Sequence, residues 1–274
     1  MLVFLFVVGL CLGSFVNALV WRIYQQSKLK SAEKKRYYSI LYGRSMCPDC
    51  RHNLSLKDLI PVVSWILLKG KCRYCHKPIS GQYPIVELGT AILCVLSYIW
   101  WPLVFGVSGS FSFALWLLFL TGFVALAIYD FKWFLLPDKI VYPLILIALI
   151  ELVIKATAMG GGVHLITQAF WGLLCLAGLF YLLYVVSGGA WIGFGDVKLA
   201  IVLGLLVGGP LPALLVVFFA SVIGSIVALP LLIKGRVKAT SRIPFGPLLL
   251  ISTVIIVLFG THLTSWYNHL FYLY

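Results

Sequence analysis

Eight long apolar runs are the feature that most restricts how this chain can fold. Each is close to the roughly 20 residues that an α-helix needs to cross the hydrocarbon core of a bilayer. Only 11% of the residues are charged and 62% are hydrophobic, whereas soluble domains carry roughly 25% charged residues. We therefore predict an all-α, polytopic membrane protein with about eight transmembrane helices. The runs cover residues 1–21, 84–101, 111–129, 140–157, 163–186, 191–209, 211–233 and 247–265.

Basic residues predict how these helices are oriented. Of the 21 Lys and Arg residues, 13 lie in the segment 22–77, and with eight spans all of the others except Lys155 fall on the same side. Because basic residues are concentrated in cytoplasmic loops, we expect this loop in the cytoplasm and both termini outside. The "GGPLP" break at 208–212 also permits one long broken helix, but merging runs six and seven would place the basic residues of 234–242 outside, against this bias.

The predicted organisation has three parts. Residues 1–21 form the first transmembrane helix, which we interpret as a retained span because it lacks the basic start of a signal peptide. Residues 22–83 form a basic cytoplasmic loop, and 84–274 form a seven-helix core. The net charge of +13 does not indicate nucleic-acid binding, because basic loops next to membrane spans are already explained by orientation and by contact with anionic lipid.

Two CxxC pairs stand out in the loop. "CPDC" and "CRYC" are separated by residues 51–71, a spacing typical of a structural zinc site with four thiolates. Two disulfides, two redox motifs or chance are the alternatives; a reducing cytoplasm disfavours structural disulfides. His52 and His76 are next to the pairs, but four cysteines already complete a tetrahedral shell. We predict structural Zn²⁺ held by Cys47, Cys50, Cys72 and Cys75.

Acidic residues are rare after the loop, and three of the five have a simple explanation. Glu151 lies four residues before Lys155, which predicts an ion pair on one helix face. Asp138 follows a proline at a predicted helix start and is interpreted as an N-cap. Glu87 is expected in the first turn of the second span, where the helix dipole favours an anion.

Asp130 and Asp196 remain as candidates for catalysis. Both are predicted just below the cytoplasmic membrane surface, where an unpartnered acid is costly; pairing with Lys132 and with Lys198 is the alternative explanation. Gly193 and Gly195 before Asp196 would weaken a helix start and allow a close backbone approach or a strained turn. Two adjacent carboxylates can share one proton, so that one activates water and the other protonates a carbonyl oxygen. This pattern predicts an aspartyl peptidase.

Several motifs, in this order and spacing, resemble the type IV prepilin peptidases, which are GxGD-type aspartic proteases of the bacterial inner or plasma membrane. The resemblance implies that Asp130 and Asp196 are the catalytic pair, that Gly193 and Gly195 are signature glycines, and that the four cysteines are the zinc-type cysteines. The resemblance depends on "GSFVNALVWR", the paired CxxC loop, "DLIPVVSW", "GKCRYC", "ISGQYPIVEL", "FKWFLLPD" after Asp130, and "GFGDVKLA".

The same resemblance implies the substrates and a second activity. Members cleave prepilins and pseudopilins at the cytoplasmic face, after the glycine that ends a short basic leader, and usually N-methylate the new N-terminus with S-adenosylmethionine. No Rossmann-type glycine motif is present, so the methyl-donor site stays unassigned. A peptidase without methylation, an ion-coupled transporter and a membrane-anchored zinc-knuckle adaptor are the alternatives; the adaptor leaves both aspartates without a role.

Overall fold

The computed structural model describes residues 1–29, 37–40, 42–158, 160, 162–234 and 244–271. All regular secondary structure within these residues is helical. They contain no strand, only two isolated antiparallel bridges. The predicted all-α class is therefore confirmed. The helices are α1 (Leu2–Lys28), the 3-10 helix η1 (Leu56–Leu59), α3 (Val63–Leu67), α4 (Gln82–Ile99), α5 (Val107–Trp133), α6 (Asp138–Thr157), α7 (Gly162–Ser187), α8 (Phe194–Val207), α9 (Pro210–Ile233) and α10 (Gly246–Phe271).

Each of the eight apolar runs corresponds to one helix. Six of these helices, α1, α4, α5, α6, α7 and α9, are long and apolar enough to cross a membrane. This makes the chain a multi-pass membrane protein. α8 has only 14 residues, and the apolar part of α10 covers Gly246–Gly260. Runs six and seven form separate helices: α8 ends before Gly208, whose φ of 66° is left-handed, and α9 begins at Pro210, as expected for a glycine terminator and a proline at a helix start.

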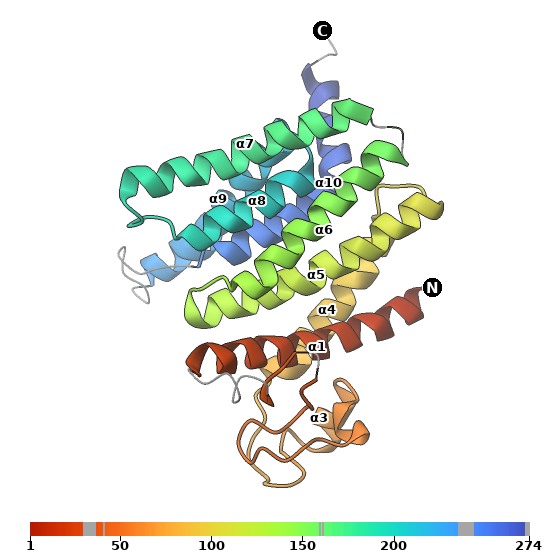
Figure 1. The fold of residues 1–274 in the computed structure, drawn as a ribbon, viewed down its shortest axis with the longest axis vertical. Helices are drawn as coiled ribbons and strands as arrows, with labels where there is room; N and C mark the ends of the chain where they lie inside the picture. Colours follow the sequence, from red (N-terminus) through yellow and green to blue (C-terminus); the bar gives the residue numbers. More distant parts are fainter. Residues whose placement is uncertain (30–36, 41, 159, 161, 235–243, 272–274) are drawn as a thin grey trace. The chain divides into compact units, whose positions relative to one another are not determined.

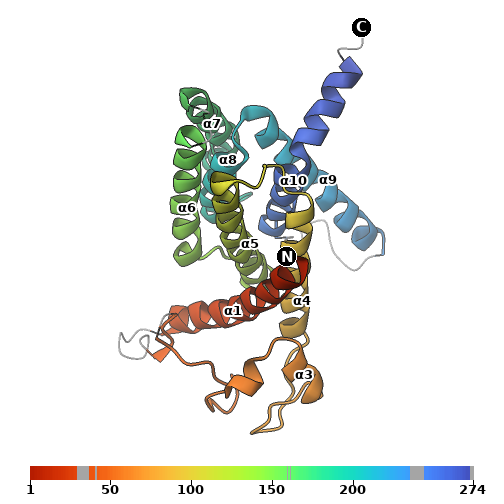
Figure 2. The same ribbon diagram turned by 90° about the vertical axis from the view of Figure 1, so that its right-hand side faces the viewer.

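The chain divides into two compact units. The first consists of residues 1–99 with 120–125, and its main contact is between α1 and α4, which cross each other (Figure 2). Two glycines on α1 allow this contact. A Cβ at Gly9 would lie 2.5 Å from the Cα of Ala91, and one at Gly13 would lie 2.6 Å from the Cα of Glu87. Small residues four apart let helices approach closely in a membrane, so the G-x-x-x-G pattern brings the two backbones together.

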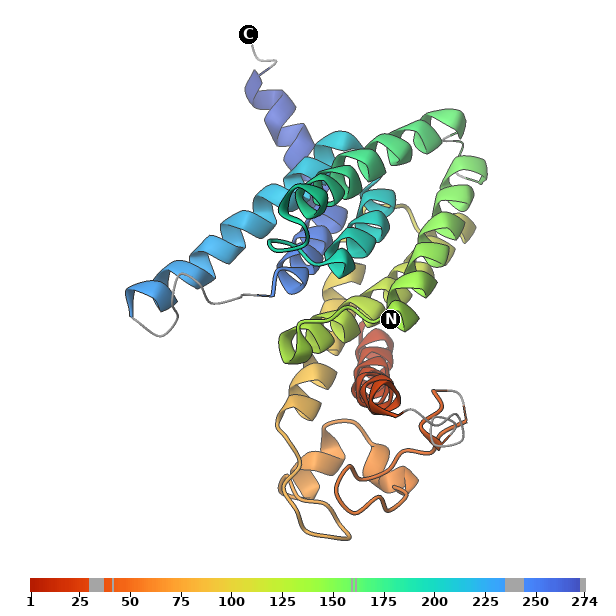
Figure 3. The same ribbon diagram turned by 60° about the vertical axis from the view of Figure 1, so that its left-hand side comes forward.

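The second unit consists of residues 100–119 and 126–274. α8 packs against α6, α7 and α10 (Figure 1; Figure 3). Glycines again form the closest contact, because a Cβ at Gly204 of α8 would lie 2.7 Å from the Cα of Leu173 on α7. The side chains of Leu199 and Leu203 are completely buried. A short helix inside the unit therefore carries the "GFGD" segment at its first turn.

Candidate active site and metal centre

Asp130 lies near the end of α5 and is buried, with 6% of its surface exposed. The helix ends three residues later, where Phe134 adopts a left-handed φ of 54° and its N–H donates to the carbonyl oxygen of Asp130 at 2.8 Å. The backbone N–H of Gly246, the first residue of α10, donates to the Asp130 carboxylate. The end of one helix and the start of another therefore fix this side chain.

Asp196 lies in the first turn of α8. Its backbone N–H donates to the carbonyl oxygen of Gly193 at 3.1 Å, and Gly193 is the N-cap of the helix. The partial positive charge of a helix N-terminus favours an anion at this position. Both candidate carboxylates therefore lie at helix N-termini, Asp196 on its own helix and Asp130 against the start of α10.

The two aspartates lie within electrostatic reach of each other. Leu136 links the segments that carry them: a Cβ at Gly195 would lie 3.2 Å from the Cβ of Leu136, and a Cβ at Gly246 would lie 3.7 Å from its Cδ2. Three segments distant in sequence thus converge, namely the chain after α5, the start of α8 and the start of α10. The structure brings together the two aspartates that sequence reasoning singled out.

The backbone at the glycines before Asp196 is not strained. Gly193 has φ −75° and ψ 151°, an extended backbone that any residue adopts, so the strained turn is not observed. Gly195 is approached closely by the side chain of Leu136, not by a backbone segment. Gly195 therefore provides room for Leu136 next to the carboxylate. A Cβ at Gly193 would lie 3.8 Å from Oδ2 of Asp196, an ordinary contact distance.

Neither lysine proposed as an alternative partner forms an ion pair with the aspartates, and Lys132 lies over the ring of Trp133. Lys198 forms an ion pair with Asp138, which links the first turns of α8 and α6. Asp138 is the first residue of α6 and caps nothing, because the N-cap is Pro137; the predicted N-cap role was wrong. Over the described ranges, none of the ion pairs involves Asp130 or Asp196. The predicted pair of Glu151 and Lys155 is confirmed at 3.1 Å.

Glu87 is the second acid whose predicted role was wrong. It is the sixth residue of α4, beyond the first turn, and is buried with 6% exposed. One of its oxygens, Oε2, accepts the backbone N–H of Val62 at 2.7 Å, and the hydroxyl of Ser14 also bonds to the carboxylate. Glu87 therefore connects α1, α4 and the cysteine loop within the first unit.

The four loop cysteines come together in one cluster, with all four Sγ atoms within 4.8 Å of one another. A tetrahedral zinc ion with Zn–S bonds of about 2.3 Å needs S–S edges of about 3.8 Å. The Sγ atoms of Cys47 and Cys75 are 3.9 Å apart. His52 and His76 do not belong to the cluster, and the ring of His52 lies against that of Tyr74, with the two planes tilted by 33°. The four sulfur donors and their spacing therefore fit a metal site with four thiolate ligands.

The two CxxC hairpins repeat the same backbone geometry. In each, the N–H of the first cysteine donates to a carbonyl five residues later, at 3.0 Å for Cys47 and 2.9 Å for Cys72. Each also has a left-handed residue four positions after its first cysteine, Arg51 and His76, both with φ 58°. An antiparallel bridge closes each hairpin. Two equivalent hairpins therefore supply two sulfurs each.

The cysteine thiols differ in acidity before any metal binds. Burial raises the pKa of Cys47 to about 12. Burial also opposes ionisation of Cys72, but the backbone N–H groups of Cys75 and Tyr74 outweigh it and lower the pKa of Cys72 to about 7. Because metals bind thiolates, occupation of such a cluster releases protons.

Sequence reasoning missed Gly246 and Leu136. Gly246 lies in "IPFGP", after the basic segment 234–242, and a glycine before a proline at the start of an apolar run was the only available signal. Leu136 carried no signal, because one leucine in an apolar chain resembles all the others.

Comparisons with known proteins agree with this architecture. Residues 7–101 match the model of the bacterial peptidase A24 N-terminal domain, and residues 116–229 match that of the type IV leader peptidase family. Both Asp130 and Asp196 fall in the second match. No solved structure matches the chain significantly.

Three relatives are each named prepilin leader peptidase/N-methyltransferase. The protein of Aeromonas salmonicida (strain A449) is 33% identical over 97% of this chain and 92% of its own length. That of Pseudomonas aeruginosa is 32% identical over 94% of this chain and 90% of its own length. That of Burkholderia pseudomallei (strain K96243) is 32% identical over 95% of this chain and 86% of its own length.

A multi-pass helical fold that carries these motifs defines a membrane-embedded enzyme of the peptidase class. The chain belongs to the type IV leader peptidase family, as its family matches and its identity to these relatives show. The resemblance seen in the sequence is thereby confirmed.

Proposed function

We propose that the chain is an aspartic endopeptidase that uses Asp130 and Asp196 to remove the leader of type IV prepilins or pseudopilins. One carboxylate, ionised, takes a proton from a water molecule as the water oxygen attacks the scissile carbonyl carbon. The other, protonated, donates its proton to the carbonyl oxygen. Collapse of this intermediate breaks the C–N bond, and the amine leaves with a proton. The convergence of the two carboxylates at helix N-termini carries the proposal.

The substrate assignment comes from the relatives and from the family resemblance. The names of the relatives specify prepilin leaders, and the resemblance implies a short basic leader that ends in glycine. We also propose that the enzyme N-methylates the new N-terminus with S-adenosylmethionine, because the relatives are named N-methyltransferases. The four cysteines would hold a structural Zn²⁺ that shapes the loop and leaves no open coordination position for chemistry.

The proposed topology is that of a bacterial inner membrane protein with eight spans, including α8 and α10. The loop 22–83 would be cytoplasmic, both termini outside, and 84–274 would form the seven-helix core. The distribution of Lys and Arg supports this arrangement, since basic loops stay in the cytoplasm. Cleavage would then occur near the cytoplasmic surface, where both aspartates were predicted.

Substitution of each aspartate tests the peptidase. Purified Asp130→Asn and Asp196→Asn enzymes are expected to remove a prepilin leader more than about a hundredfold more slowly, because each loses one proton-transfer group. Glu151→Gln is the control, since it changes a buried acid that pairs with Lys155 away from the site. Normal cleavage by either Asn variant would refute the mechanism. The mass of the product's N-terminus, measured with S-adenosylmethionine present, tests methylation separately.

A further inference from the structure

Lys198 is a charged side chain of α8 to which the peptidase mechanism gives no role. It lies two residues after Asp196, and only 17% of its side chain is exposed. Residues two apart on a helix do not face each other, so Lys198 and Asp196 meet different neighbours. The ammonium group of Lys198 forms an ion pair with Asp138, the first residue of α6. Its charge is therefore engaged with α6 and not with the proposed catalytic pair.

Two aromatic rings enclose the same ammonium group. Nζ of Lys198 lies 5.6 Å from the centre of the Tyr142 ring on α6 and 5.4 Å from that of the Phe194 ring on α8. A cation within about 6 Å of a ring centre is attracted by the negative face of the ring. Asp138 and Tyr142 lie one turn apart on α6, as Phe194 and Lys198 do on α8. One carboxylate and two rings, contributed by both helices, therefore hold the lysine.

This ion pair differs from an ordinary pair on a protein surface. An isolated surface pair contributes little, because two long, mobile side chains must be held in one geometry. Asp138 is half exposed, but Lys198 is mostly enclosed and lies against two rings. Its position is thus restricted by several contacts at once. Such a contact can fix how the first turns of α6 and α8 lie relative to each other.

The segment 136–138 contacts α8 on both sides of Asp196. Before the aspartate, a Cβ at Gly195 would lie 3.2 Å from the Cβ of Leu136. After it, Lys198 pairs with Asp138. The carboxylate of the proposed mechanism therefore lies between two contacts with one short segment of chain.

The same segment is connected to the other aspartate. A Cβ at Gly246 would lie 3.7 Å from Cδ2 of Leu136, and the backbone N–H of Gly246 donates to the carboxylate of Asp130. A shift of the first turn of α8 along segment 136–138 would therefore change the separation of the two carboxylates. Because both groups must reach one water molecule and one carbonyl, a displacement of about 1 Å is costly.

We propose that Lys198 and Asp138 are positioning residues of the peptidase. Their ion pair, held between the rings of Phe194 and Tyr142, fixes the first turn of α8 and keeps Asp196 in place with respect to Asp130. This inference rests on the proposed function, which gives Asp196 its chemical role. The pair acts through Asp196 and not through contact with the leader, so its loss is expected to affect the rate of the reaction and not the binding of the prepilin.

Steady-state kinetics of leader cleavage by the purified full-length enzyme test this role. Lys198→Met and Asp138→Asn each remove one charge of the pair. Each is expected to lower kcat about 10- to 100-fold, whereas KM for the prepilin changes less than about threefold, as for an interaction that acts only in the transition state. Lys198→Arg keeps the positive charge and is expected to lose less than about threefold. The double variant is expected to be no slower than the slower single variant, because both lose the same interaction.

A second ion pair of the same unit provides the matched control. Glu151 and Lys155 pair within α6, and the double variant Glu151→Gln/Lys155→Met removes both charges together. It is expected to cleave at the wild-type rate, because this pair does not connect α6 with α8. Thermal melting identifies any variant that has not folded. If Lys198→Met fails this check, Asp138→Asn decides, since the side chain of Asp138 is half exposed.

Several outcomes would overturn the proposal. Wild-type kcat in both single variants would do so, and so would rate losses in the double variant that are the product of the single losses. A KM that rises with the number of basic residues in the leader, at unchanged kcat, would assign Asp138 to leader binding instead. Asp196→Asn in the same assay tests the proposed function separately. Normal cleavage by that variant refutes the mechanism itself, whereas cleavage that needs Asp196 but not the ion pair refutes only the positioning role.

Discussion

Gly246 contributes to the carboxylate site both through its amide and through its lack of a side chain. Its N–H donates to Asp130, and a Cβ on this residue would lie 2.6 Å from Oδ2 of the same aspartate. An added methyl group would therefore displace the carboxylate itself.

Gly246→Ala is predicted to slow leader cleavage on the order of 10- to 100-fold, since small displacements of reacting groups have effects of this size. The measurement is the rate of prepilin cleavage, with thermal melting to confirm the fold. Gly260→Ala in the same helix is the control, because its Cβ would meet Ile256 at an ordinary 3.5 Å. Equal rates for the two variants would contradict the role given to Gly246.

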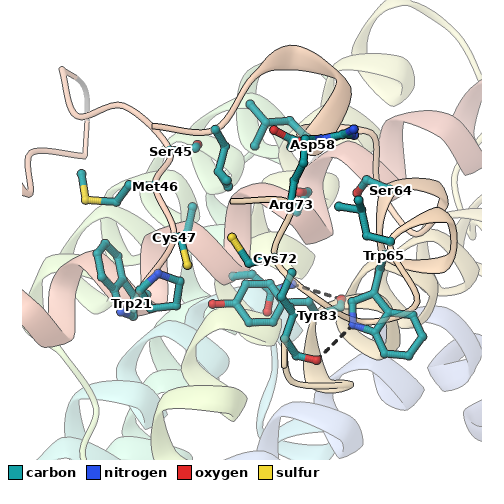
Figure 4. A pocket seen from close by; sticks show the side chains of 18 of the residues that line it. Trp21, Ser45, Met46, Cys47, Asp58, Ser64, Trp65, Cys72, Arg73 and Tyr83 are labelled. Carbon is teal, nitrogen blue, oxygen red and sulfur yellow. Dashed lines mark hydrogen bonds and ion pairs between the residues drawn. The ribbon is translucent and has the colours of Figure 1, made fainter. Parts of the chain in front are cut away.

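Asp58, which lies beside Arg73 in Figure 4, accepts four hydrogen bonds within the described part of the cysteine loop. Its carboxylate accepts bonds from the N–H and hydroxyl of Ser55, from Nε of Arg73 and from the hydroxyl of Tyr74, at 2.7–3.1 Å. Burial by itself favours the protonated acid, but the bonds from Arg73 and Ser55 outweigh it and lower the pKa of Asp58 to about 2. These bonds attach the helix η1 to the second CxxC hairpin.

Asp58→Asn is predicted to destabilise the loop by about 1–3 kcal/mol at pH 7, because an amide nitrogen cannot accept the lost bonds. The folded-state pKa lies below the unfolded value of about 3.9. The stabilisation is therefore complete above pH 4 to 5 and disappears as the pH falls toward 2. Melting temperatures of wild type and variant are expected to converge over this range. A difference that stays constant down to pH 2 would rule out the carboxylate as its source.

At the scale of elements, the contact between α1 and α4 depends on Gly9 and Gly13. Both are approached by backbone atoms, which cannot move aside as a flexible side chain can. The contact also positions Glu87, because the Cα of this residue is the atom closest to a Cβ added at Gly13.

Gly13→Ala is predicted to destabilise the first unit by about 1–3 kcal/mol through overpacking. Gly89→Ala on α4 is the matched substitution, since nothing lies within 4 Å of its added Cβ; it is expected to be neutral or stabilising by up to about 1 kcal/mol. Thermal melting in detergent compares the two. If both variants changed the melting temperature in the same direction, the close approach of the two helices would not be important for stability.

The positions of the helices could be predicted from the sequence, whereas the contacts between their ends could not. Hydrophobic length located the eight helices that correspond to the apolar runs, and the scarcity of acids singled out Asp130 and Asp196. Spacing along a chain does not show which helix starts meet, so the contacts of Gly246 and Leu136 with the carboxylate region were not predictable. Glu87 and Asp138 were misinterpreted because each has a partner distant in sequence, Val62 and Lys198, that helix periodicity cannot reveal.

At the scale of the whole molecule, the two compact units contain different chemistry. The cysteine cluster belongs to residues 1–99, and both aspartates belong to the second unit. The two halves of the chain also match separate family models. Substitutions in the cysteine cluster are therefore expected to affect the first unit most.

Cys47→Ser is predicted to reduce bound zinc from one ion per chain to nearly none and to lower the melting temperature, because structural zinc contributes directly to folding. Leader cleavage is expected to decrease less than zinc content. Cys175→Ser in α7 lies outside the cluster and is expected to keep the metal. Unchanged zinc stoichiometry in the Cys47 variant would refute the four-thiolate assignment.

The paired hairpins also set an order of events during synthesis. Each hairpin supplies only two sulfurs, so the ribosome must release Cys75 before four ligands exist for one ion. At that moment α1 has already been made, whereas α4, which begins at Gln82, is still emerging. If the cluster holds zinc as proposed, metal capture would precede the docking of α4 onto Gly9 and Gly13, and zinc supply would act on the nascent chain as well as on the finished enzyme.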